Sequence, residues 1–162
     1  MNLLDRYMNR LDDRYRGLLA EVLYNGTEKN DRTGTGTLSR FGMSIRHNME
    51  DGFPILTTKK MPLNVISTEL KWFLKGDTNI KYLLDNNCHI WDGDAYKKYE
   101  RVYNYDLDEP LSKAEFIDKV QNDPAYMHWG LLGPIYGAQW RSWGGKKYID
   151  QISDLIENLK NN

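Results

Sequence analysis

The sequence predicts an α+β fold in which helices predominate and the sheet is incomplete. Two stretches, residues 3–24 and 149–160, each carry an apolar stripe at helical spacing. Only one clear alternation of apolar and polar residues, over 37–47, indicates a half-buried strand. An apolar helical stripe needs a sheet or another helix to cover it, and one or two strands are too few for a complete α+β core. We therefore expect part of the sheet to be missing from this chain.

Length and composition are those of one globular domain. A chain of 162 residues suits a single core, and its net charge of −1, from 22 basic and 23 acidic residues, excludes a general attraction to nucleic acid or membranes. No apolar run approaches the roughly 20 residues of a membrane span. Cys88 is the single cysteine, so an intramolecular disulfide is excluded and a reducing compartment is favoured. We expect a cytoplasmic protein that binds neither membranes nor specific nucleic acid.

The first part of the chain predicts one helix, one strand and a turn. The helix over 3–24 is expected to stop at Gly26, since glycine commonly follows a helix C-terminus. The strand over 37–47 would bury alternate residues, namely Phe41, Met43 and Ile45. Asp51-Gly52 marks a turn before a second, short apolar run.

The central part predicts two helices in succession. Pro62 suits the first turn of a helix and Gly76 its end. Its inward-facing residues are expected to be Leu63, Ile66, Leu70, and Phe73 or Leu74. Thr78 or Asn79 would cap a shorter helix over 80–87.

Residues 94–130 differ in composition from their surroundings. They are rich in tyrosine and charge and poor in aliphatic residues, which is typical of a surface insertion within the single domain 1–162. Ser112 and Glu115 have the spacing of a capping box and predict a helix of about eight residues that ends before Pro124.

The loop "NDRTGTGTLSRF", residues 30–41, is the first candidate site. Gly34 and Gly36 do not begin a dinucleotide fingerprint, because a helical pattern precedes them and a strand follows. Arg32 and the backbone N–H groups of this loop have the chemistry to hold a phosphate. A hairpin turn with a solvated arginine explains the same spacing.

Three further positions carry possible chemistry. Glu69 lies beside the apolar stripe of its helix, where a half-buried carboxyl can move protons; an exposed acid paired with a lysine is the alternative. Ile90 and Trp91 form an apolar plate that suits a flat ring, or simply part of the core. Tyr136 lies between glycines in "GPIYGAQWRSWGG", a segment that frames a pocket or a packed corner.

Cys88-His89 does not predict a catalytic pair, because neighbouring residues on an extended segment point to opposite faces. A buried structural cysteine is the better interpretation. His47 and His128 are isolated from other metal-ligand types, so no metal site is predicted.

Taken in order, these motifs resemble the thymidylate synthase family over nearly the whole chain. One glycine motif would be weak support, whereas six blocks in the family's order are strong support. The blocks are "GTEKNDRTGTGTLSRFG", "DGFPILTTKK", "STELKWFLKGDTNIKYL", "NNCHIWD", "LGPIYGAQWRSW" and "IDQISDLIENLK".

The resemblance implies a mixed sheet with helices, a homodimer, and reductive methylation of deoxyuridine monophosphate with 5,10-methylenetetrahydrofolate as co-substrate. It implies that Arg32 binds the nucleotide phosphate and that Lys59 lies on the folate side. Glu69 would organise the water network that moves protons, and Tyr136 would help to remove the C5 proton. The folate ring would pack against Ile90 and Trp91.

The family's nucleophilic cysteine lies in a Pro-Cys-His motif that this chain lacks, and Cys88 does not replace it. We therefore expect the N-terminal portion of the enzyme, inactive alone and completed by a C-terminal chain or a homodimer partner. Two alternatives stay open: a fragment similar to deoxycytidylate hydroxymethylase, and a non-catalytic binding or regulatory fragment.

Overall fold

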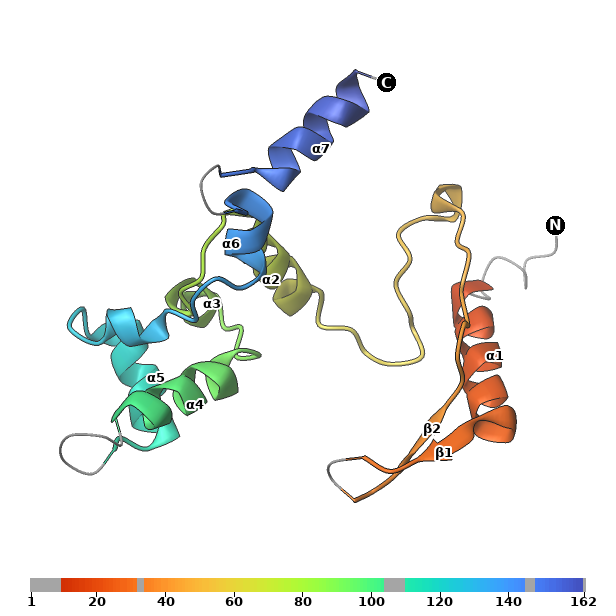
Figure 1. Cartoon of the computed structure of the whole chain (residues 1–162), viewed down its shortest axis with the longest axis horizontal. Coiled ribbons are helices and arrows are strands. Elements are labelled where there is room, and N and C mark those ends of the chain that lie inside the picture. Colours follow the sequence, from red (N-terminus) through yellow and green to blue (C-terminus); the bar gives the residue numbers. More distant parts are fainter. Residues whose placement is uncertain (1–9, 32–33, 104–109, 145–147, 162) are drawn as a thin grey trace. The chain divides into compact units, whose positions relative to one another are not determined.

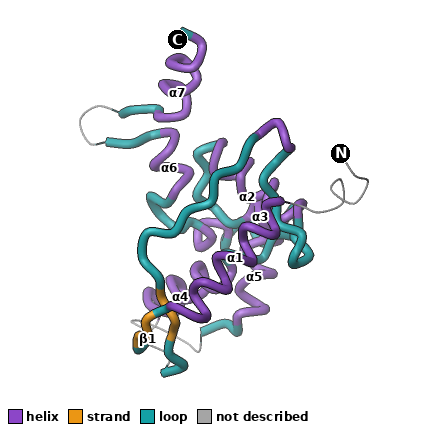
Figure 2. The backbone as a smooth tube through the Cα atoms, turned by 90° about the vertical axis from the view of Figure 1, so that its right-hand side faces the viewer, coloured by secondary structure: helices purple, strands orange, loops and turns teal. Residues whose placement is uncertain are grey.

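A computed structural model describes residues 10–31, 34–103, 110–144 and 148–161 (Figure 1). The chain divides into two compact units between Met61 and Pro62. The described residues form helices and one two-stranded sheet, which is compatible with an α+β fold (Figure 2). No helix among them is long and apolar enough to cross a membrane.

The first unit consists of a helix, a hairpin and a short 3-10 turn. Its elements are α1 (Arg10–Asn25), β1 (Thr27–Lys29), β2 (Thr37–Ser39) and η2 (Met49–Asp51). The predicted end of the first helix is confirmed, because the Gly26 N–H donates to the Val22 carbonyl at 2.9 Å. A Cβ atom on Gly26 would lie 2.2 Å from that carbonyl oxygen, so only glycine fits there. The predicted start, residues 3–9, lies outside the described residues.

The strand predicted over 37–47 is wrong in length. Only Thr37–Ser39 pairs, antiparallel to β1, with Thr27 opposite Ser39 and Lys29 opposite Thr37. Phe41, expected to face inward, is fully exposed. A strand persists only where a neighbouring strand takes its backbone hydrogen bonds, and the described residues offer this segment nothing beyond the three residues of β1.

The second unit is helical. Its elements are α2 (Leu63–Leu74), α3 (Lys81–Asp85), α4 (Asp92–Tyr103), α5 (Lys113–Asn122), η3 (Met127–Gly130), α6 (Tyr136–Arg141) and α7 (Gln151–Lys160). The helix expected after Pro62, the short helix after Asn79 and the final helix are confirmed. The capping box at Ser112 and Glu115 is also present, at the start of α5. The sequence did not predict α4, and α6 replaces an expected loop.

The predicted inward face of α2 is wrong except at Phe73, which packs against the cluster of Trp72, Leu83 and Cys88. Trp72 is fully buried, with Glu69 and Phe73 half-buried on the same side. The other residues expected inside are exposed, namely Leu63, Ile66, Leu70 and Leu74, the last of which was the alternative to Phe73. The helix is apolar on both sides, and the described residues cover only the side that holds Trp72.

Two neighbouring clusters form the core of the second unit. The larger one centres on Tyr99 and Phe116, whose rings lie 4.8 Å apart, and joins α4 to α5. The smaller one consists of Trp72, Leu83 and Cys88, all fully buried. The prediction of a buried structural cysteine is therefore confirmed.

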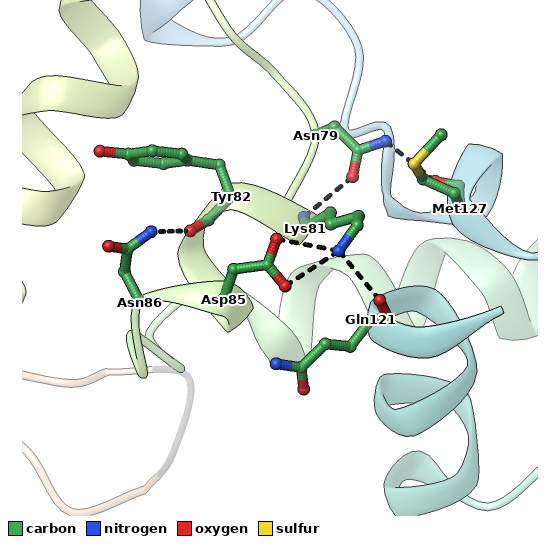
Figure 3. Close-up of polar contacts among 7 residues, drawn as sticks. All are labelled: Asn79, Lys81, Tyr82, Asp85, Asn86, Gln121 and Met127. Carbon is green, nitrogen blue, oxygen red and sulfur yellow. Dashed lines mark hydrogen bonds and ion pairs between the residues drawn. The ribbon is translucent and has the colours of Figure 1, made fainter. Parts of the chain in front are cut away.

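Polar contacts of Lys81 join α3 to α5 (Figure 3). The Lys81 ammonium contacts both carboxylate oxygens of Asp85 at 2.8–2.9 Å and donates to the Gln121 carbonyl at 3.0 Å. Beside it, the Asn79 amide donates to the Met127 carbonyl at 2.9 Å, which adds η3 to the same framework. These contacts hold the chain on either side of α4 in a defined arrangement.

Candidate functional site

Trp91 lies immediately before α4 and is the centre of the candidate site. Its indole N–H donates to the Glu69 carboxylate of α2 at 2.7 Å. Two residues that the sequence singled out separately are therefore in direct contact. The hydrogen bond holds one carboxylate oxygen of Glu69 in place while the side chain stays partly exposed.

Aromatic rings surround this hydrogen bond. Trp91 lies 6.1 Å from the ring of Tyr136 and 5.7 Å from the ring of Trp72. Phe73 meets Tyr136 edge-on at 5.3 Å and Trp91 at 6.3 Å. Edge-to-face pairs of this kind are favourable and fix ring orientation. The result is a rigid aromatic wall with a carboxylate at one side.

Two glycines let α2 and α6 approach closely enough to build this wall. Gly76 has a φ of 71°, and a Cβ atom there would lie 2.9 Å from the Cβ of Arg141. A Cβ atom on Gly137 would lie 2.5 Å from the Asp77 carbonyl oxygen. Side chains at these positions would push the helices apart and move Tyr136 away from Phe73.

The turn that presents Trp91 is tied together by His89. Its Nδ1 lies 3.0 Å from a carboxylate oxygen of Asp92, and its Nε2 lies 3.1 Å from the side-chain oxygen of Asn87. Asn87 has a φ of 54°, a left-handed conformation that asparagine tolerates better than most residues. The second carboxylate oxygen of Asp92 is buried and has no hydrogen-bond partner among the residues that the structure describes.

Cys88 is unsuited to nucleophilic chemistry. Burial raises the pKa of its thiol, and the carboxylates of Glu69 and Asp92 raise that pKa further, against a lowering by the Ile90 backbone. A thiol reacts as the thiolate, and a raised pKa in a closed core keeps it protonated.

The remaining predicted site residues lie in different places. Ile90 is 51% exposed and Tyr136 52% exposed, so both are accessible beside Trp91. Lys59 is exposed in a bend of the first unit. Arg32 lies outside the described residues.

The loop that precedes β2 is organised by Asp31. One of its carboxylate oxygens accepts from the backbone N–H groups of Thr35 and Gly36 at 3.1 and 3.3 Å. Gly34 and Gly36 have φ values of 74° and 78°, which the tight loop requires. In this conformation the N–H groups of Thr35 and Gly36 donate to Asp31 and are not available to an anion.

Sequence reasoning missed Trp72, and it predicted Phe73 only as an alternative inward-facing residue of α2, without a place in the site. Phe73 follows Glu69 by one helical turn, and a carboxylate with an aromatic residue four positions later was an available signal. Among the described residues, no group of three or more histidine, cysteine or acidic side chains could hold a metal ion.

A sequence model of the thymidylate synthase family matches residues 13–162. The chain belongs to the thymidylate synthase family. The matched region holds every residue of the aromatic wall together with Arg32 and Lys59. Membership of this family supports a fold that mixes helices and strands, and the family is one of methyltransferases.

Two curated thymidylate synthases are similar at the level of sequence. That of Mesoplasma florum is 44% identical over 149 residues, and that of Phytoplasma mali is 49% identical over 150 residues. Each match covers 91% of this chain and 50% of the relative. The chain therefore spans about half the length of the thymidylate synthases it matches.

Proposed function

We propose that this chain supplies the folate wall, the proton-transfer groups and the phosphate loop of a thymidylate synthase, and that the nucleophile comes from a complementary half. The reaction is reductive methylation of deoxyuridine monophosphate to thymidine monophosphate. The single observation that carries the proposal is the contact of Glu69 with Trp91 inside the aromatic wall.

The wall fits a flat heteroaromatic ring. Trp91 and Tyr136 offer ring surface, and Ile90 adds exposed apolar contact beside them. Methylenetetrahydrofolate supplies a one-carbon unit and the electrons that reduce it to a methyl group. In this proposal Ile90 and Trp91 pack against its ring, and Lys59 contacts its tail.

Glu69 and Tyr136 act on protons. Methylation at C5 of uracil replaces the C5 hydrogen, which must leave as a proton. The Glu69 carboxylate, held by Trp91, orders the water that carries this proton, and Tyr136 belongs to the same network. The rings of Phe73 and Trp91 reduce access of bulk water. Arg32 binds the nucleotide phosphate.

The nucleophile that adds to C6 of uracil must come from elsewhere. The sequence has one cysteine, Cys88, and it is fully buried with a raised pKa. We therefore propose that the 162 residues alone do not turn over. A reduced, buried thiol also suits the cytoplasm, which we propose as the location.

Tritium release from deoxyuridine monophosphate labelled at C5 tests this function. The chain is mixed with a polypeptide that corresponds to the unmatched half of the Phytoplasma mali enzyme, and methylenetetrahydrofolate is added. We expect release from the mixture and none from either part alone. Release by this chain alone would contradict the assignment of the nucleophile to the other half.

Substitutions in this chain test whether Glu69 takes part in tritium release by the mixture. Glu69→Gln should lower the rate of release by about 100-fold or more, in the range typical of a positioned proton-transfer group. The matched control is Glu100→Gln, a half-buried carboxyl on α4 away from the wall, which should retain the rate. Equal rates for the two variants would remove Glu69 from the mechanism.

A further inference from the structure

The imidazole ring of His89 lies between two oxygen atoms. Its Nδ1 is 3.0 Å from a carboxylate oxygen of Asp92, and its Nε2 is 3.1 Å from the side-chain oxygen of Asn87. A neutral imidazole has one N–H donor and one bare nitrogen, whereas the imidazolium has two N–H donors. Only the imidazolium can therefore donate to both oxygens at the same time.

Asp92 is a buried carboxylate that needs a cationic partner. The residue is 7% exposed, and one of its oxygens has no hydrogen-bond partner among the described residues. Burial of a carboxylate is costly unless a cation or hydrogen-bond donors compensate its charge. In the described part of the chain, His89 is the only basic side chain that pairs with it.

Other titratable groups lie around this carboxylate on two further helices. Glu69 of α2 acts together with Asp92 on the buried Cys88 thiol and raises its pKa. Lys113 and Asp118 of α5 line a surface recess together with Asp92. Three carboxyls and one ammonium group make this neighbourhood negative before the imidazole is counted.

The two contacts of the ring bridge a segment that is anchored at both ends. On the α4 side, the Trp91 carbonyl accepts from the N–H groups of Asp94 and Ala95 at 3.2 and 3.1 Å. On the α3 side, the Cys88 N–H donates to the Leu83 carbonyl at 2.9 Å. The histidine ring ties together the residues between these two anchors, next to the indole of the aromatic wall.

We propose that His89 is a positioning residue, which as an imidazolium holds the indole of Trp91 on the Glu69 carboxylate. Its side chain is 51% exposed, so protons exchange with solvent. Loss of a proton removes one of the two contacts, loosens residues 87–92 and weakens the 2.7 Å hydrogen bond between the indole and the carboxylate. The inference rests on the proposed function for its effect on turnover, whereas its effect on the indole does not require turnover.

A rotated amide of Asn87 is the competing arrangement. Exchange of its oxygen and nitrogen would place an NH₂ donor beside Nε2, and a neutral ring with its proton on Nδ1 would then satisfy both neighbours. That arrangement leaves the buried Asp92 without a cationic partner. It also makes the neutral ring the one that holds the segment, so loss of a proton would not loosen Trp91.

Nuclear magnetic resonance of the full 162-residue chain, labelled with ¹⁵N, separates the two arrangements. The chain is measured alone and in the mixture with the second polypeptide, from about pH 5 to about pH 8, where histidines titrate. His89→Gln and Trp91→Phe identify the ring and indole signals. We expect two protonated ring nitrogens at the acidic end, and an indole signal that changes with the same midpoint as the ring. The indole of Trp72, which donates to the Asn79 carbonyl at 2.9 Å, is the internal control and should stay constant.

Asn87→Gly removes one acceptor and preserves the turn, because glycine adopts the φ of 54° without strain. The Trp91 indole signal should then no longer follow the ring. In the mixture, tritium release at saturating deoxyuridine monophosphate should fall by about tenfold, close to the cost of one lost hydrogen bond to a charged group. The KM for the nucleotide should stay the same, because Trp91 is proposed to contact the folate. The matched control is His128→Gln, an exposed histidine on η3, which should retain both the rate and the coupled signals.

Each outcome decides the inference. A His89 ring that keeps one bare nitrogen at about pH 5 would establish the rotated amide and overturn it. A Trp91 indole that does not respond to the titration of the ring would also overturn it, as would equal rates for Asn87→Gly and the control. Coupled signals without tritium release from any mixture would support the positioning role and contradict the proposed function instead.

Discussion

Among single residues, Glu69 and Trp91 carry the chemistry of the proposed site. A carboxylate near an aromatic wall is useful only if its position is fixed, and the indole N–H provides that at 2.7 Å. His89 helps to position Trp91 without contacting Glu69, because its contacts with Asn87 and Asp92 close the turn that carries Trp91. The geometry of the Glu69–Trp91 pair therefore depends also on residues outside that pair.

Gly76 and Gly93 give opposite predictions for substitution by alanine. Gly76→Ala should lower the free energy of unfolding by more than about 1 kcal/mol, because its φ of 71° disfavours a side chain and the added Cβ meets Arg141. Gly93→Ala, inside α4 with no atom within 4 Å of the added Cβ, should raise it by up to about 1 kcal/mol. Urea titrations followed by circular dichroism measure both, and equal effects would contradict the close approach of α2 and α6.

At the scale of elements, the capping box of α5 is the clearest case of a sequence signal that became structure. The Ser112 hydroxyl accepts from the Glu115 N–H at 3.4 Å, and the Ser112 N–H donates to the Glu115 carboxylate at 2.9 Å. Both partners lie within one helical turn, so no distant packing is needed to form the motif.

Ser112→Ala should lower the free energy of unfolding by about 1 kcal/mol at neutral pH, as loss of an N-cap does. Hydrogen bonds from Ser112 lower the pKa of the Glu115 carboxyl below its ordinary value of 4.5. A carboxyl whose pKa is lowered by folding stabilises the folded protein at pH values above its ordinary pKa, and this stabilisation is lost as the pH falls through the lowered pKa. The difference in the free energy of unfolding between the original protein and Ser112→Ala should therefore shrink between pH 5 and about pH 3. Ser67→Ala, an exposed position within α2, is the control and should change stability by less than about 0.5 kcal/mol.

At the scale of the whole molecule, the division between Met61 and Pro62 separates two units with different content. The second contains both hydrophobic clusters, whereas the buried residues described in the first are Leu11 and Asp12, near the start of α1. The Thr57 N–H and hydroxyl donate to the Asp12 carboxylate within that first unit. We therefore expect the units to respond separately to proteases and denaturants.

Trypsin should cut near the division between the units before it cuts within α3. Lys59 and Lys60 are exposed and belong to no helix or strand, so a protease can bind the chain around them in extended form. Lys81 is the internal control, because it lies in α3 and its ammonium is held by Asp85 and Gln121. Mass spectrometry of early fragments should show cleavage after Lys59 or Lys60 before cleavage after Lys81; the reverse order would contradict this account.

Cys88 reports on the core of the second unit. Its thiol is fully buried and its pKa is raised, so a disulfide reagent should modify it slowly in buffer and rapidly in urea. The sequence has one cysteine, so the reaction has a single site. Equal rates in buffer and urea would show that the Trp72 and Leu83 cluster does not close over it.

Features that depend on neighbouring residues and on the order of motifs could be predicted from the sequence. These include the stop at Gly26, the capping box at Ser112, the burial of Cys88 and the resemblance to the thymidylate synthase family. The contact of Glu69 with Trp91 at 2.7 Å, across 22 residues, and the position of Tyr136 beside them could be seen only in the folded chain. The tertiary structure also decided which face of α2 is buried and where β2 ends. Helix caps and helix stops depend on residues that are adjacent in the sequence. Burial and strand pairing depend instead on which distant segment packs against a helix face or pairs with a strand.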